Sequence, residues 1–191
     1  MKLFLTYSHF DLAEYGKRAR EIASECSWDV VDGNVQALGD RFRRVKESDA
    51  LLLLSARYYG KSEQSDEELD WDFARKENKI AGALLVSDSS VWPLAKIQME
   101  SGKQDSLARF HEKVKATDFL GNFEYDPISI DRSLREILAR MASELEVRSQ
   151  KTVFVVWDFQ IDGLEIILSS LKKKPPSGFS VIVSGLPEER S

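Results

Sequence analysis

The run ALLLL at residues 50–54 is the most apolar stretch of this sequence, and it is the strongest single indication of the fold class. An unbroken apolar run of this length is typical of a strand that is covered on both faces, as strands of parallel sheets are. Polar residues enclose it, with Ser48 and Asp49 before it and Ser55 after it. We therefore predict that residues 50–54 form the central strand of a parallel sheet.

The apolar segments on either side alternate between strand-like and helix-like spacing. Short apolar runs predict further strands at residues 3–5, 28–31, 80–86 and 119–123. Three- and four-residue spacing predicts helices at residues 12–26, 35–45, 66–78, 107–114 and 134–145. In the third helix, Leu69, Phe73 and Ala74 are expected to face the core. Because alternating strands and helices form βαβ units, we predict an α/β fold with helices on both faces of a parallel sheet.

A polar break, RSQK at residues 148–151, follows the last of these helices. The pattern then restarts with a strand at residues 152–157, a helix at 164–171, a turn at 175–178 and a strand at 179–183. A single βαβ unit of this size is too small to bury its own core. We predict a domain at residues 1–147 and an extra βαβ unit at 148–191, which either extends the sheet or begins a second, truncated domain; the second alternative is slightly favoured.

Composition excludes several classes of function. The net charge of −5 disfavours nucleic-acid binding, which usually needs a basic face, and the basic cluster of Arg41, Arg43 and Arg44 is predicted to be solvated surface. A single cysteine and two widely separated histidines provide neither a disulfide nor metal-ligand spacing. The first residues become polar too early for a signal peptide, and no apolar run is long enough to span a membrane, so a cytoplasmic location without membrane contact is expected.

Four short motifs follow one another in a fixed order. They are LFLTYSHFD at residues 3–11, WDVVD at 28–32 before a loop at 33–40, the pair Ser48-Asp49 followed by the apolar strand and then by Ser55, Tyr58 and Ser62, and the pair Glu68-Leu69. Together they resemble the Toll/interleukin-1 receptor (TIR) domain family over residues 1–147. The spacing of Asp70 and Ala74 also resembles a TIR-related branch of uncharacterised domains at the N-termini of bacterial signalling and defence proteins.

The resemblance implies a flavodoxin-like (TIR-like) sheet and, in enzymatic members, cleavage of the nicotinamide–ribose bond of NAD. NAD is then a substrate, and no prosthetic group or metal is expected. Glu68 corresponds to the catalytic carboxylate of the family, with Asp70 as the alternative. The residues expected to contact NAD are Tyr7, Ser8, Phe10, Asp11, Asn34, Ser55, Tyr58 and Trp71. The Trp-Cys pair of the family is absent, and Glu63-Gln64-Ser65-Asp66 stands in its place.

Each of these assignments has a structural alternative. The acidic residues 66–70 would also stabilise a helix N-terminus through the helix dipole. Ser8 and Asp11 would also serve as helix-capping residues, and Trp71 as a core aromatic.

Three functions are therefore compared. The first is an NAD-cleaving effector domain of immune or defence signalling that is activated by self-assembly and continues into a domain beyond residue 191. The second is a non-catalytic TIR-type adaptor that associates through the same surfaces. The third is an enzyme similar to nucleoside deoxyribosyltransferases, which also place a carboxylate beside a sugar.

Overall fold

The computed structural model describes residues 1–33, 37–149, 151–156 and 179–184. The chain divides into two compact units, Met1–Ser143 and Glu144–Ser191. The first contains a sheet of five parallel strands: β1 (Lys2–Tyr7), β2 (Asp29–Asp32), β3 (Ala50–Ser55), β4 (Ile80–Val86) and β5 (Leu120–Phe123). Their order, β2-β1-β3-β4-β5, is the doubly wound order of flavodoxin-like folds. The predicted fold class is confirmed, and β3 is the central strand.

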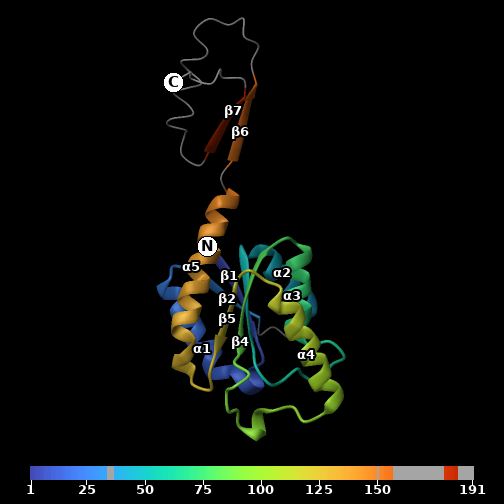
Figure 1. Ribbon diagram of the computed structural model, residues 1–191. Coiled ribbons are helices and arrows are strands. Elements are labelled where there is room, and N and C mark those ends of the chain that lie inside the picture. Colours follow the sequence, from blue (N-terminus) through green and yellow to red (C-terminus); the bar gives the residue numbers. More distant parts are fainter. Residues whose placement is uncertain (34–36, 150, 157–178, 185–191) are drawn as a thin grey trace, which may run out of the picture. The chain divides into compact units, whose positions relative to one another are not determined.

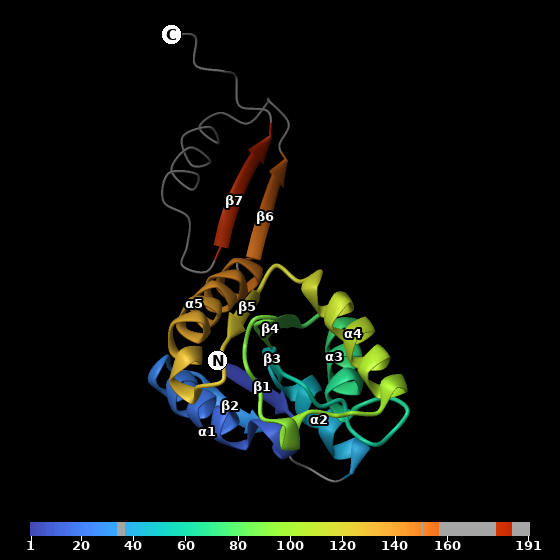
Figure 2. The same cartoon turned by 60° about the horizontal axis from the view of Figure 1, so that its bottom comes forward.

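Helices cover both faces of this sheet (Figures 1 and 2). One layer contains α1 (His9–Glu25) and α5 (Ile130–Ser149), and the other contains α2 (Leu38–Glu47), α3 (Asp66–Lys76) and α4 (Ser101–Lys115). Two single-turn 3₁₀ helices, η1 (Leu94–Lys96) and η2 (Pro127–Ser129), lie in the connections. Helix α4 begins six residues before the predicted position 107. The prediction missed these residues because the first turns, SGKQDS, carry no apolar side chain.

The inner face of α3 differs from the prediction. Its buried residues are Asp70, Trp71 and Ala74, whereas Leu69 and Phe73 are only partly buried. Phe73 lies at the interface with α2, where its ring stacks on Phe42 with the centroids 4.3 Å apart. The core-facing side of α3 is therefore rotated relative to the expected one, and this rotation decides which acidic residue faces the edge of the sheet.

The second unit contains β6 (Lys151–Val156) and β7 (Phe179–Ser184), which pair in parallel as a separate two-stranded sheet. The helix predicted at residues 164–171 and the turn at 175–178 lie outside the described residues. The domain boundary near residue 147 stays a prediction. Over the part of the chain that the structure describes, no helix has an apolar stretch sufficient to cross a lipid bilayer.

Candidate functional site

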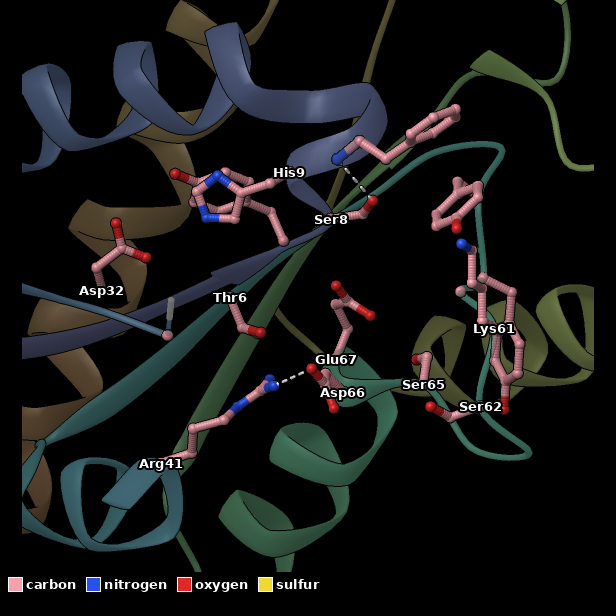
Figure 3. A pocket seen from close by; sticks show the side chains of 16 residues that line it. Thr6, Ser8, His9, Asp32, Arg41, Lys61, Ser62, Ser65, Asp66 and Glu67 are labelled. Carbon is pink, nitrogen blue, oxygen red and sulfur yellow. Dashed lines mark hydrogen bonds and ion pairs between the residues drawn. The ribbon is translucent and has the colours of Figure 1, made fainter. Parts of the chain in front are cut away.

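A cleft of about 330 Å³ opens at the carboxyl ends of β1 and β3. We call it the rim cleft; it is lined by residues 6–10, 32–33, 41, 58–62 and 65–67 (Figure 3). In the order β2-β1-β3-β4-β5, the direction of winding reverses between β1 and β3. Open α/β sheets bind ligands at this switch point, because the loops that follow the two strands lead to opposite faces and separate there. The rim cleft thus lies where the fold favours a ligand.

Two helices begin at the cleft. The Ser8 hydroxyl accepts a hydrogen bond from the Phe10 amide at 3.3 Å and caps α1, and the Ser65 hydroxyl accepts one from the Glu68 amide at 3.0 Å and caps α3. Both serines line the cleft. Since unpaired amide groups give a helix N-terminus a partial positive charge, both α1 and α3 present their positive ends here.

Helix α3 contributes two acidic residues to the rim cleft, Asp66 and Glu67. Glu67 is the one directed toward the start of α1. Its side chain rises from the first turn of the helix toward Ser8 (Figure 3). Burial among protein atoms raises the pKa of its carboxyl to about 7, and the nearby Arg41 charge only partly opposes this effect. A carboxyl group with a strongly shifted pKa inside a cleft is typical of a functional site.

Aromatic residues form part of the cleft wall. The rings of Phe10 and Tyr58 lie 4.5 Å apart, and Phe10 is exposed although it is large and apolar. Tyr7 is buried, and its ring lies so close to Gly16 that a Cβ atom there would stand 2.0 Å from the ring. Gly16 thus permits the position of Tyr7, and Phe10 and Tyr58 provide surface on which a planar ring can stack.

The two carboxylates proposed from the sequence lie elsewhere. Glu68 accepts a hydrogen bond from the Tyr59 hydroxyl and pairs with Lys113 at 3.3 Å. Asp70 is fully buried; it pairs with Arg41 and accepts a hydrogen bond from the Thr6 hydroxyl at 2.7 Å. Neither carboxylate lines the rim cleft. Both carboxylates are engaged with other side chains. The orientation of α3 differs from the predicted one, and it places Glu67 in the cleft instead.

The other predicted contact residues divide into two groups. Tyr7, Ser8, Phe10 and Tyr58 do line the cleft. The remaining four do not belong to its described lining: Asp11 is buried beneath the loop after β3, Ser55 lies 2.9 Å from His111, Trp71 is part of the hydrophobic core, and Asn34 lies outside the described residues. Trp71 is therefore a core aromatic residue, which was the structural alternative to a contact with NAD.

Asp11 is a buried carboxyl group whose two oxygens differ in their hydrogen bonding. One carboxyl oxygen accepts a hydrogen bond from the Arg57 amide at 3.3 Å, and the other has no protein partner. Burial raises the pKa of this carboxyl from 3.8 to about 6, so the folded state binds a proton that the unfolded state has released. Stability should therefore fall as the pH rises from about 4 to about 6.

Replacing Asp11 with asparagine should remove this dependence. We expect Asp11→Asn to unfold with a free energy about 1–3 kcal/mol higher than the wild type near neutral pH, with the difference disappearing near pH 4. Urea unfolding at both pH values measures it. A variant that is less stable than the wild type at neutral pH would contradict the cost assigned to this buried carboxylate.

Arg41 is the cation that the sequence prediction misplaced. It was expected on the surface with Arg43 and Arg44, but the residue is only 6% exposed and lines the cleft beside Asp66. The prediction of a solvated Arg41 is wrong because its side chain pairs with a carboxylate of the neighbouring helix. Arg41, Asp66 and Glu67 are thus among the cleft residues that sequence reasoning did not select as ligand contacts.

In the described residues, no group of three or more histidine, cysteine or acidic side chains is arranged to hold a metal ion. No protein-family model and no curated protein matches the chain. Solved structures similar to it include a flavodoxin from the domain Archaea, with 14% identity, a TM-score of 0.41, and coverage of 76% of this chain and 99% of that one. Another is a short-chain flavodoxin associated with a non-canonical PDU bacterial microcompartment, with 14% identity, a TM-score of 0.38, and coverage of 74% and 96%.

Proposed function

We propose that the rim cleft binds NAD and that Glu67 promotes cleavage of its nicotinamide–ribose bond. The observation that carries this proposal is the position of Glu67, inside the cleft and opposite Ser8, at the switch point of the sheet. The TIR resemblance of residues 1–147 supplies the reaction, and the geometry supports a different acidic residue from the one that corresponds to the family glutamate.

The chemistry requires a negative group beside the sugar. When the bond between the anomeric carbon and the pyridinium nitrogen breaks, nicotinamide leaves as a neutral molecule with the bonding electrons, and positive charge develops on the ribose. An ionised Glu67 would stabilise this charge in surroundings that are partly shielded from water. Water then attacks the anomeric carbon and loses a proton, and a carboxylate with a pKa near 7 is suited to accept it.

The aromatic pair supports the binding of a planar ring. Phe10 lies in the first turn of α1 and Tyr58 in the loop after β3, and their faces offer apolar surface to a nicotinamide or adenine ring. Burial of an aromatic ligand would also account for an exposed Phe10, since large apolar side chains at a cleft are typical of binding sites.

The experiment is incubation of the concentrated protein with NAD, alone and clustered on a multivalent scaffold, with nicotinamide followed by chromatography. Release of nicotinamide in stoichiometric excess over protein supports the proposal. Exchange of bases between deoxynucleosides without NAD turnover would favour the transferase instead. No turnover in either state would favour the adaptor.

The adaptor is the second candidate because exposed apolar side chains lie in the connection between β4 and α4. Val91, Leu94 and Met99 are 87%, 76% and 70% exposed. Apolar groups clustered in one segment are a common feature of protein-binding surfaces. If this is the function, Val91→Ser, Leu94→Ser or Met99→Ser should reduce self-association measured by light scattering.

The pH dependence of NAD cleavage follows from the shifted pKa of Glu67. Because only the ionised carboxylate stabilises a cation, the rate should fall about tenfold for each pH unit below about 6 and level off above about 8. Initial rates across this range measure the profile. A rate that is constant between about pH 5 and pH 8 would contradict the role of Glu67.

A further inference from the structure

One edge of the Arg41 guanidinium is oriented from within the protein. Its Nε donates to one oxygen of Asp70 at 3.2 Å, and its Nη2 donates to the other oxygen. Asp70 is fully buried and is held in turn by the Thr6 hydroxyl. A bidentate pair of this kind fixes the plane of the guanidinium as well as its position.

The other edge of Arg41 belongs to the rim cleft. Its Nη1 pairs with Asp66 at 2.5 Å, and both residues line the cleft (Figure 3). The two carboxylates differ greatly in exposure, since the side chain of Asp66 is 64% exposed and that of Asp70 is 0% exposed. Asp70 alone neutralises the arginine charge. Asp66 is therefore a second carboxylate that the buried pair does not require.

We propose that Arg41 is an anion-binding residue and that the phosphate group of a nucleotide displaces Asp66 from it. The Nη1–Nη2 edge of a guanidinium matches two oxygens of a phosphate, and an exposed carboxylate competes only weakly for it. This inference deepens the proposed function and rests on it for the natural ligand, because it assigns the pyrophosphate of NAD to Arg41 while the ribose lies near Glu67.

The arrangement also places the phosphate beside the start of α3. Asp66 is the first residue of this helix, whose N-terminus carries partial positive charge. An anion that takes the place of the Asp66 carboxylate remains within reach of the same charge. The displacement exchanges one anion for another and leaves the buried pair of Arg41 and Asp70 intact.

The test compares binding of three probes, namely inorganic phosphate, inorganic pyrophosphate and ADP-ribose, to the wild type and to Asp66→Asn by isothermal titration calorimetry. Removing the competing carboxylate should tighten binding of pyrophosphate and ADP-ribose about fivefold. Tighter binding of ADP-ribose than of either inorganic anion identifies a nucleotide site, and the reverse order overturns the nucleotide assignment.

The matched control is Asp72→Asn, which removes the same charge from the same helix. Asp72 pairs with Lys113 and does not line the cleft. Arg41→Lys, which keeps the charge without the fork, should weaken binding; if this variant does not fold, the comparison of the two aspartates decides. Equal affinities in Asp66→Asn and Asp72→Asn, or no binding at millimolar concentration, would overturn the inference. Nicotinamide release in that case would leave the proposed function intact.

Discussion

Replacing Glu67 with glutamine should lower the rate of NAD cleavage by about 100- to 1,000-fold. Glutamine has nearly the same shape but cannot carry the negative charge that stabilises a developing ribosyl cation. Binding should change less than turnover, because the ground state carries its positive charge on the pyridinium ring. Chromatographic measurement of nicotinamide release at saturating NAD gives the turnover number directly.

The matched control for this variant is Glu68→Gln. Glu68 stands next to Glu67 in the sequence and is the residue that corresponds to the TIR glutamate, but its carboxylate contacts Tyr59 and Lys113. We expect it to keep activity within a few-fold of the wild type. If Glu68→Gln loses turnover and Glu67→Gln retains it, the catalytic assignment returns to Glu68.

The second large effect concerns stability. Asp70→Ala should lower the free energy of unfolding by about 3–5 kcal/mol, since it leaves the Arg41 guanidinium buried without its principal partner. The Thr6 hydroxyl also loses its acceptor. For a domain of this size, the loss corresponds to a decrease in melting temperature of roughly 10 °C, which differential scanning calorimetry measures.

Asp72→Ala is the control on the same helix. Its carboxylate pairs with Lys113, and both side chains are more than a third exposed. Exposed pairs contribute little, so the expected loss is below about 1 kcal/mol. Similar decreases in the free energy of unfolding of the two variants would show that the buried pair of Asp70 and Arg41 contributes no more to stability than an exposed pair. Asp70 would then be free to be reconsidered as a functional carboxylate.

The fold was predictable because its central strands, β3 and β4, are almost entirely apolar. The run at residues 50–54 and the strand at residues 80–86 are covered on both faces, so neither depends on the orientation of a single side chain. The strand order β2-β1-β3-β4-β5 was not predicted from the sequence; only a flavodoxin-like sheet was expected, and that expectation came from the TIR resemblance. The polar start of α4 was missed because periodicity detects apolar faces only.

The site was less predictable because it depends on the rotation of one helix. Expecting Leu69 and Phe73 in the core gave no reason to direct Glu67 inward. In the structure, Glu67 lies three residues before the buried Asp70 and four before the buried Trp71, so it is on the same face of α3, one turn earlier. The spacing of Glu67, Asp70, Trp71 and Ala74 along the sequence is compatible with one helix face. It indicates the buried face only if an aspartate, Asp70, is assumed to be buried.

Arg41 was missed for a different reason. Its partner Asp70 lies 29 residues away on another helix, so local composition showed only a basic cluster. A buried arginine can be expected only when a carboxylate faces it. The pairing between α2 and α3 is a tertiary contact that the spacing of residues along one segment does not encode.

The central claim, that Glu67 faces the reacting sugar, is tested most directly by a carboxyl-detected NMR titration of this residue, with Glu67→Gln to assign the signal. We predict a pKa of about 7 in the free protein and a lower value when a non-cleavable carbocyclic analogue of NAD brings a pyridinium cation next to the carboxyl. A pKa close to the ordinary 4.5 that does not move with the analogue would contradict the account.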